Sequence, residues 1–296
     1  MLAAILATIL VAYLALPVAR SYLLVAAHHS DPLPPADLAV TDLDLGPGLS
    51  GWSVQAAIGA PAVVLVHGFK TSREEMLPWA RFLHDAGYNV ALFDTRGCGR
   101  SAGAVIGLGA TEPRDISRAV AAARGVFRTT AVAALGISVG AGEVILAAAT
   151  DPGVTAVIAD SAWTDEDFQL GRLSFIPVGP VRVPLPPYGV AVVNALVGAD
   201  VSQARPLEVI GRIAPRPVLL IHSADDENAT TTVDGARRLF EAAAEPKQIW
   251  IVPHGGHVGA INAFPNEYRA RPGIPRDCAP LVIRAAGPTP APRGSP

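Results

Sequence analysis

Short, almost continuously apolar runs recur along the chain and alternate with segments of helical character. The runs are Ala62–Val66, Val90–Phe93, Ala131–Leu135, Val154–Ala159, Val218–Ile221 and Ile249–Val252. Runs rich in Val, Ile, Leu and Ala without polar alternation are typical of strands buried on both faces of a parallel sheet. The helical segments between them are Met76–Ala86, Glu112–Val126, Ala141–Ala149 and Val233–Ala244. This alternation predicts an α/β fold with a mostly parallel, doubly wound sheet, preceded by a hairpin from Leu38–Leu45 and Gly51–Ala57.

Two stretches interrupt the alternation. Residues 163–217 hold eight prolines and no clear strand, so we expect a cap insertion after strand six that lies over the carboxyl edge of the sheet, where α/β ligand sites form. Residues 272–296 carry seven prolines and little apolar periodicity, and this composition predicts a disordered tail. The catalytic domain is therefore expected over residues 38–271.

The first 27 residues are the most apolar part of the chain. Leu2 to Ala19 is an uncharged run of 18 residues, long enough for a helix of roughly 27 Å against a hydrocarbon core of ~30 Å. We favour a membrane anchor over a cleaved signal peptide, although Val25-Ala26-Ala27 resembles a cleavage site, and over a buried core helix. Arg20 is the basic residue nearest to this apolar run and follows it in the sequence, which by the positive-inside tendency favours a cytoplasmic domain. One residue does not decide the orientation, so the side of the membrane on which the domain lies stays open. Residues 28–37 are polar and proline-rich and are expected to form a linker.

Composition excludes several other classes. The chain has 296 residues, enough for one sizeable core, and a net charge of −3, so neither a nucleic-acid partner nor a polyanionic substrate is indicated. Its two cysteines, Cys98 and Cys278, are too few for a disulfide framework and are not spaced as metal ligands. No cofactor or metal is implied.

A Gly-x-Ser-x-Gly pattern follows one of the predicted strands. Gly136-Ile137-Ser138-Val139-Gly140 comes directly after Ala131–Leu135 and opens the next helix. A nucleophile elbow needs this arrangement, because a sharp strand-to-helix turn lifts the serine above the sheet and flanking glycines let the backbone pass closely. The alternative is a glycine-rich turn with an idle serine.

A serine hydroxyl needs a base to remove its proton, and the base needs a carboxylate to orient it. His257 follows the last predicted strand, and both Asp225 and Asp226 follow Val218–Ile221. The order Ser, Asp, His, with each residue at the carboxyl end of a strand, places all three at one edge of the sheet. His254 is the alternative base.

A tetrahedral intermediate also needs backbone donors for its oxyanion. We expect the N–H of Phe69, after the strand that ends at Val66, and the N–H of Val139, which follows the nucleophile. His67 is expected to brace this loop by hydrogen bonds.

Together these motifs resemble the bacterial α/β-hydrolases of the serine aminopeptidase-like, Bem46-like and esterase-like group. The motifs are His67-Gly68-Phe69, Gly87-Tyr88, the run from Asp94 to Ser101, the elbow, Asp160-Ser161-Ala162-Trp163, the run from Arg216 to His222, and Gly256-His257. The resemblance implies the α/β-hydrolase fold and selects Asp226 over Asp225 as the acid.

Three further expectations come from this resemblance. Asp94 and Arg96 should form a buried ion pair. Glu112 and Asp115 on the following helix would either join this pair or lie on a solvent-exposed helix face. Cys98, where the group often has His, should be an inert thiol. The final helix that normally follows a Glu-Tyr pair, here Glu267-Tyr268, is expected to be missing, because prolines follow directly.

The sequence therefore predicts a serine hydrolase that cleaves a carboxylic ester or related acyl bond through an acyl-enzyme. The catalytic residues would be Ser138, Asp226 and His257. The expected partners are a small-molecule acyl substrate and a membrane bound through the N-terminal segment, while the oligomeric state is left open. Alternatives are a peptidase or thioesterase that uses the same triad, or a non-catalytic membrane protein with this fold.

Overall fold

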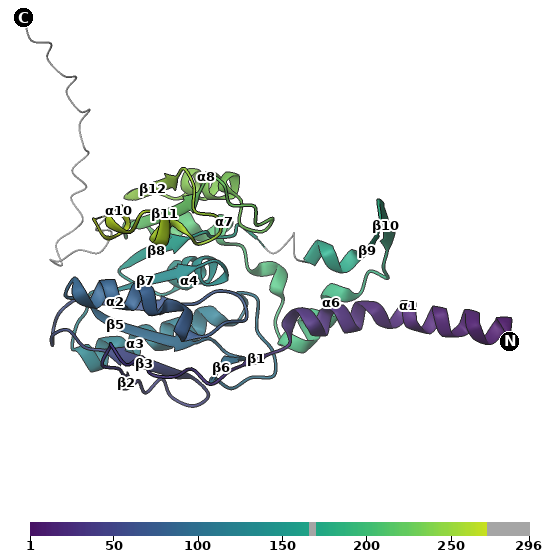
Figure 1. Cartoon of the computed structure of the whole chain (residues 1–296), viewed down its shortest axis with the longest axis horizontal. Coiled ribbons are helices and arrows are strands. Elements are labelled where there is room, and N and C mark those ends of the chain that lie inside the picture. Colours follow the sequence, from purple (N-terminus) through teal and green to yellow (C-terminus); the bar gives the residue numbers. More distant parts are fainter. Residues whose placement is uncertain (166–169, 271–296) are drawn as a thin grey trace, which may run out of the picture.

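An eight-stranded sheet forms the centre of the protein (Figure 1). The computed structural model describes residues 1–165 and 170–270. The strand order is β12-β11-β8-β7-β4-β5-β3-β2, and all neighbours are parallel except β2 with β3 and β3 with β5. The strands are β2 (Thr41–Asp42), β3 (Ser50–Val54), β4 (Ala62–Val66), β5 (Asn89–Asp94), β7 (Val132–Ile137), β8 (Ala156–Asp160), β11 (Val218–Ser223) and β12 (Lys247–Val252).

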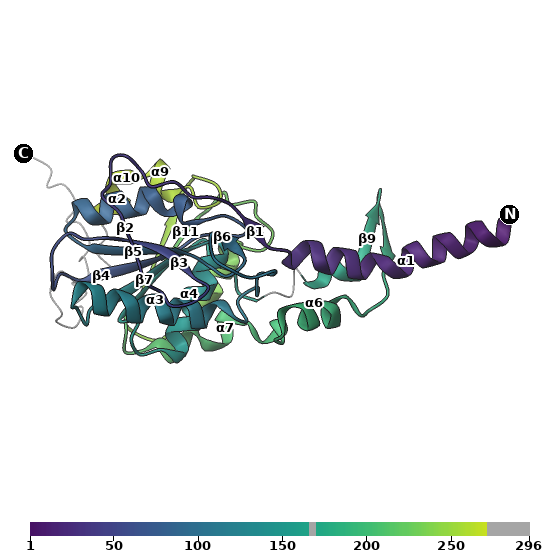
Figure 2. The same cartoon turned by 90° about the horizontal axis from the view of Figure 1, so that it is seen from below.

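Helices cover both faces of the sheet (Figure 2). One face carries α2 (Leu77–Asp85), α9 (Ala260–Ala263) and α10 (Pro265–Ala270), and the other carries α3 (Glu112–Phe127), α4 (Val139–Thr150), α7 (Pro206–Val209) and α8 (Val233–Ala242). Short 3₁₀ turns are η1 (Arg73–Met76), η2 (Arg172–Ser174), η3 (Val201–Gln203) and η4 (Ile210–Ile213). The predicted doubly wound sheet is confirmed, and its strands and helices lie within a few residues of the predicted ones.

The central strands are apolar throughout because both of their faces are buried. In β4, Val63 and Leu65 belong to the core beneath α2, whereas Val64 and Val66 belong to the core beneath α3 and α4. Helix α4 lies over the middle of the sheet and is likewise buried over most of its length. Because β7, β8 and β11 are parallel neighbours, their carboxyl ends lie at the same edge of the sheet.

The N-terminal helix α1 (Leu2–Val25) extends away from the sheet (Figure 2). It is long and apolar enough to cross a membrane, and only Pro17, Ser21 and Val25 of this helix are buried. Helix α6 (Gly189–Val197) lies beside its second half, where the hydroxyl of Ser21 donates to the Gly189 carbonyl at 2.8 Å.

The expectation of a strand-free insertion over residues 163–217 is wrong. Strands β9 (Phe175–Val178) and β10 (Val181–Pro184) pair as an antiparallel hairpin, because valine-rich arms flank a Gly179-Pro180 turn. The hairpin and α6 lie beside α1 rather than over the sheet (Figures 1 and 2).

Residues 28–37, which were expected to form a linker, are hydrogen-bonded to the domain. Strand β1 (His28–His29) pairs in parallel with β6 (Cys98–Gly99), and Asp31 forms an ion pair with Arg100. Farther along, the amide of Leu33 donates to Glu74 at 3.0 Å. The proline-rich tail over 272–296 lies outside the described residues, and so does any helix after Glu267-Tyr268, a pair that belongs to α10.

Candidate active site

Ser138 lies in the turn between β7 and α4. Its backbone has φ 52° and ψ −117°, a conformation that non-glycine residues seldom adopt and that here aims the side chain away from the sheet. The flanking glycines are required by contact with backbone. A Cβ on Gly136 would lie 2.1 Å from the Gly140 carbonyl oxygen, and one on Gly140 would lie 2.5 Å from the Val66 carbonyl oxygen. The local geometry is that of a nucleophile elbow.

The structure brings Ser138, His257 and Asp226 into one hydrogen-bonded chain. His257 Nε2 lies 2.8 Å from Ser138 Oγ, and His257 Nδ1 lies 2.9 Å from Asp226 Oδ2. The alternative base His254 instead packs its ring 4.9 Å from the ring centroid of Phe264. With the carboxylate beside Nδ1, the proton of the neutral imidazole sits on that nitrogen, and Nε2 is left to accept from the serine.

Asp226 is the acid that contacts the imidazole, whereas Asp225 braces the histidine loop. The Asp225 carboxylate accepts from the amides of Gly255 and Gly256 at 3.3 and 2.8 Å. The side chain of Asp226 is fully buried, and His222 Nε2 lies 3.3 Å from its Oδ2. Burial raises the pKa of Asp226, but hydrogen bonds from His222, His257 and the Asn228 amide outweigh burial and hold this pKa below its ordinary value. Asp226 is therefore ionised at neutral pH.

Phe69 and Val139 lie at one small cavity beside Ser138. They line it together with Leu108, Trp163, Asp165, Thr230 and Thr231. Within residues 1–165 and 170–270, neither the Phe69 nor the Val139 amide donates to another group, so both are available to a ligand. The N-terminus of α4 adds its positive dipole end at the same place.

Residues 60–178 match the family described as Serine aminopeptidase, S33. The fold is similar to that of the esterase Pf2001 from Pyrococcus furiosus, with a TM-score of 0.66 and 22% identity, over 84% of this chain and 96% of that one. The chain has the α/β-hydrolase fold.

Other proteins give the same likeness. The structure "Ferulic Acid bound to Est1E from Butyrivibrio proteoclasticus" superposes with a TM-score of 0.57 at 17% identity, covering 74% of this chain and 91% of that one. In sequence, the protein YqkD of Bacillus subtilis is 27% identical over 231 residues, which span 75% of each chain. The likeness thus extends over most of this α/β-hydrolase domain.

In this hydrolase fold, His67 holds the Phe69 loop by its ring nitrogens. Nδ1 lies 2.8 Å from the Gly68 carbonyl and Nε2 accepts from the Thr95 amide at 3.0 Å. Burial lowers the pKa of His67 despite the Gly68 carbonyl. The neutral ring therefore carries its proton on Nδ1, and His67 braces the loop as expected.

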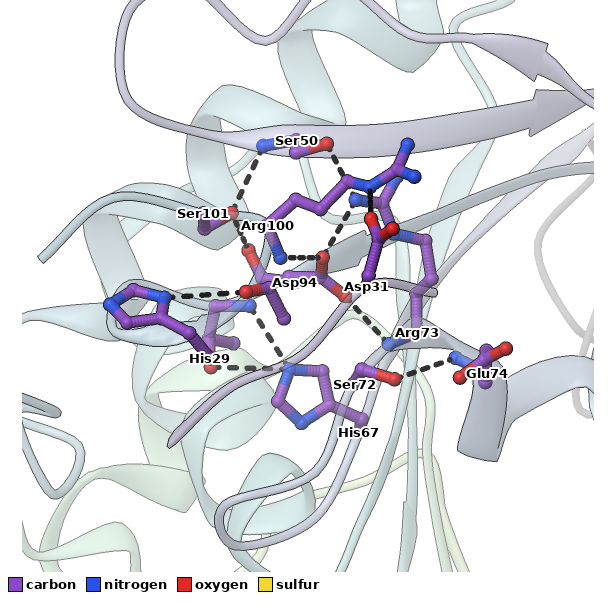
Figure 3. Close-up of polar contacts among 12 residues, drawn as sticks. His29, Asp31, Ser50, His67, Ser72, Arg73, Glu74, Asp94, Arg100 and Ser101 are labelled. Atoms are coloured by element: carbon purple, nitrogen blue, oxygen red, sulfur yellow. Dashed lines mark hydrogen bonds and ion pairs between the residues drawn. The ribbon is translucent and has the colours of Figure 1, made fainter. Parts of the chain in front are cut away.

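Asp94 is the centre of a buried polar network behind this loop (Figure 3). Its carboxylate accepts from the Arg73 amide at 2.7 Å and from Arg73 Nη2 at 2.6 Å, and from the Arg100 amide at 2.8 Å. Arg73 is 1% exposed and also lies over the Trp52 ring. This network joins η1 to β5 and fixes the far end of the loop that carries Phe69.

The predicted Asp94–Arg96 brace is wrong, because Arg96 pairs with a different carboxylate. Arg96 Nε and Nη2 both donate to Asp115 at 2.7 Å. Neither acidic residue of α3 faces solvent, since Glu112 and Asp115 are both fully buried, and Glu112 accepts from the Gly107 amide at 2.5 Å. The strand end at Asp94 is already occupied by Arg73, so the two acid–base pairs form separately.

A second buried network lies behind the His257 loop, and the sequence reasoning did not find it. Tyr268 donates to Asp160 Oδ2 at 3.0 Å and accepts from Trp79 Nε1 at 2.9 Å. Ser161 Oγ donates to Asp160 at 3.2 Å and accepts from the amide of Val258, the residue after His257, at 3.2 Å. Burial raises the pKa of Asp160 to about 6, although hydrogen bonds from Tyr268 and Ser161 oppose this rise.

Two residues near the site have simpler roles. Thr231 Oγ1 lies 3.1 Å from His257 Nδ1 and 3.4 Å from Asp226 Oδ2, and its Thr-Thr-Thr sequence context carries no motif that could have predicted this contact. Cys98 is buried, and burial raises the pKa of its thiol to about 12, so it is unreactive as expected. Within the described residues, no three His, Cys, Asp or Glu side chains are grouped as metal ligands would be.

Proposed function

We propose that the protein is a serine hydrolase that cleaves carboxylic esters through an acyl-enzyme, with Ser138 as nucleophile, His257 as base and Asp226 as orienting acid. The observation that carries this proposal is the unbroken chain from Ser138 Oγ through His257 to the buried Asp226, with contacts of 2.8 and 2.9 Å. Such a chain activates an alcohol that would otherwise be a weak nucleophile.

The reaction follows from this geometry. Ser138 Oγ bonds to the ester carbonyl carbon while its proton moves to His257 Nε2, and the amides of Phe69 and Val139 bind the oxyanion. The bond to the leaving alcohol then breaks, and His257 gives that alcohol the proton. A water molecule next loses a proton to His257 and attacks the acyl carbon. Ser138 leaves with this proton, and a carboxylic acid is released.

Asp226 contributes by its charge and its position. Because its pKa lies below the ordinary value, it is ionised when His257 becomes cationic and stabilises that cation. Asp225, which binds the Gly255 and Gly256 amides, keeps the histidine loop in place. The similarity to the Pyrococcus furiosus esterase Pf2001 supports an ester rather than an amide as the substrate.

The first experiment is labelling with a fluorophosphonate probe, using the full chain in detergent micelles. Wild type should be labelled, Ser138→Ala should not, and His257→Ala should be labelled at least about 100-fold more slowly. Ser174→Ala is the control, because Ser174 is an exposed serine outside the elbow. Equal labelling of the wild type and Ser138→Ala would end the proposal. A panel of p-nitrophenyl esters, thioesters and aminoacyl anilides then separates esterase from thioesterase and peptidase.

We also propose that α1 is retained as a single-pass membrane anchor. Cleavage after Ala27 would remove contacts that extend well into the helix: Tyr13 donates to the Pro184 carbonyl at 2.7 Å, and Arg20 donates to that of Arg172 at 2.7 Å. The intact mass of protein purified from membranes tests this, since loss of residues 1–27 would contradict it.

A further inference from the structure

We propose that the β9–β10 hairpin and α6 enter the membrane together with α1, and that the site beside Ser138 takes the acyl chain of an ester lipid from that membrane. The lipid substrate rests on the proposed hydrolase function, whereas the membrane insertion of the hairpin does not. Three observations support it: the depth of the contacts along α1, the surface of the insertion, and the apolar cluster between α1 and the cavity.

The insertion reaches deep along the anchor helix. Contacts extend from Ser21, which donates to Gly189, to Tyr13, which donates to Pro184. Arg20 marks the water interface of α1, because the 18 residues before it are uncharged. From Arg20 to Tyr13 the helix rises by roughly 10 Å, about a third of the ~30 Å hydrocarbon core. A segment bound at Tyr13 therefore lies below the headgroups.

The surface of the insertion suits this depth. Val178 and Val181 at the hairpin turn are each 58% exposed, and Leu196 of α6 is 38% exposed. Residues 171–199 contain no acidic residue, and their only basic ones are Arg172 and Arg182. Arg182 lies over the Phe175 ring at 4.8 Å, and a long arginine side chain extends its charge toward the interface. An apolar surface with cationic side chains suits a lipid bilayer better than a soluble partner.

An apolar cluster connects the end of α1 to the cavity at Ser138. Val25, the last residue of α1, packs in one buried cluster with Leu173, Val193 and Leu108. Leu108 in turn lines the cavity with Phe69 and Val139. In addition, Lys70 Nζ donates to the Leu23 carbonyl at 2.7 Å, which fastens the Phe69 loop to the last turn of α1. The catalytic edge of the sheet thus faces the membrane surface, where an acyl chain enters from the lipid.

The test of insertion does not depend on activity. Full-length Val178→Cys carrying an NBD label, in a Cys278→Ser background, is reconstituted into phosphatidylcholine–phosphatidylglycerol vesicles. Cys98 does not compete for the label, because it is buried and its thiol pKa is about 12. We expect blue-shifted NBD emission that lipids with nitroxide-labelled acyl chains quench. Ile58→Cys is the control, because Ile58 is 55% exposed and lies just before the amino end of β4, at the edge of the sheet opposite to its carboxyl ends. Equal emission and quenching at the two sites would refute insertion.

The test of substrate compares two esters in the same vesicles. The double variant Val178→Asp and Val181→Asp should hydrolyse a vesicle-embedded fluorogenic diacyl phospholipid at least about tenfold more slowly, yet act on soluble p-nitrophenyl butyrate within about twofold of the wild type. Ile58→Asp should match the wild type on both. If the wild type hydrolyses p-nitrophenyl butyrate but not the phospholipid, the lipid substrate is refuted and the proposed hydrolase function is retained. The absence of Ser138-dependent turnover of every ester would refute the hydrolase, while the NBD result would still decide insertion.

Discussion

Asp160 makes the stability of the protein depend on pH in a direction opposite to that of most carboxylates. Its folded pKa is about 6, raised by burial above the ordinary 3.8. Between these values the folded chain keeps a proton that the unfolded chain has lost, so the contribution of Asp160 to the free energy of unfolding is full below pH 4. It is lost as the pH rises through 6. The difference of about two pK units corresponds to about 3 kcal/mol.

The variant Asp160→Asn isolates this effect, because an amide of the same shape does not titrate. The unfolding free energy of Asp160→Asn minus that of the wild type should increase by about 2–3 kcal/mol between pH 4 and pH 7. Any constant cost of altered hydrogen bonds shifts the whole curve and leaves this increase unchanged. Guanidinium unfolding of the full chain in micelles, followed by tryptophan fluorescence at each pH, measures the difference.

Asp85→Asn is the matched control, since Asp85 is an exposed aspartate at the end of α2, and its difference from the wild type should stay flat within about 0.5 kcal/mol. Tyr268→Phe should move the midpoint of the wild-type transition to higher pH, because it removes a hydrogen bond that lowers the pKa of Asp160. Two outcomes for Asp160→Asn would refute the reasoning: a flat difference, which would mean that the pKa of Asp160 is the same in the folded and unfolded chain, or a difference that decreases with pH, which would mean that folding stabilises the carboxylate.

Three other predictions concern the site and its braces. Asp226→Asn should lower kcat for a p-nitrophenyl ester on the order of 10⁴-fold by removing the charge that orients His257, while Asp225→Asn should stay within about tenfold; equal losses would contradict the assignment of the acid. Gly140→Ala should cost at least about 2 kcal/mol in chemical denaturation, because its Cβ would meet backbone, whereas Gly125→Ala, which meets nothing, should gain up to about 1 kcal/mol. Arg73→Met should cost about 3–5 kcal/mol by leaving a buried carboxylate unpaired, and a melting temperature unchanged from the wild type would argue against that.

The sequence predicted the sheet and the elbow well because both depend on local patterns. A continuously apolar run such as Ala62–Val66 is typical of a buried strand, and Gly136 of the elbow is required by contacts with backbone only a few residues away. The meeting of Ser138, Asp226 and His257 was predicted because parallel strands bring their carboxyl ends to one edge, whatever the intervening residues are.

The choice of partner among buried charges could not be predicted in this way. Asp94 lies two residues from Arg96, yet it pairs with Arg73, which comes from the turn after the Phe69 loop. Likewise, the hydrogen bond from Tyr268 to Asp160 joins residues 108 positions apart and depends on how α10 packs. The hairpin of the insertion was missed because its strands are short and pair beside α1, so neither burial nor alternation marks them.

The pairing of β1 with β6 leaves no flexible segment between α1 and the domain. Only two residues lie between the end of α1 and a strand hydrogen-bonded to the domain, too few for free rotation. A domain on a long flexible linker can reach molecules on an opposing surface or in the surrounding solution. With α1 as the proposed anchor, this rigidly mounted domain would act only on molecules that diffuse laterally within the same bilayer or arrive close to it.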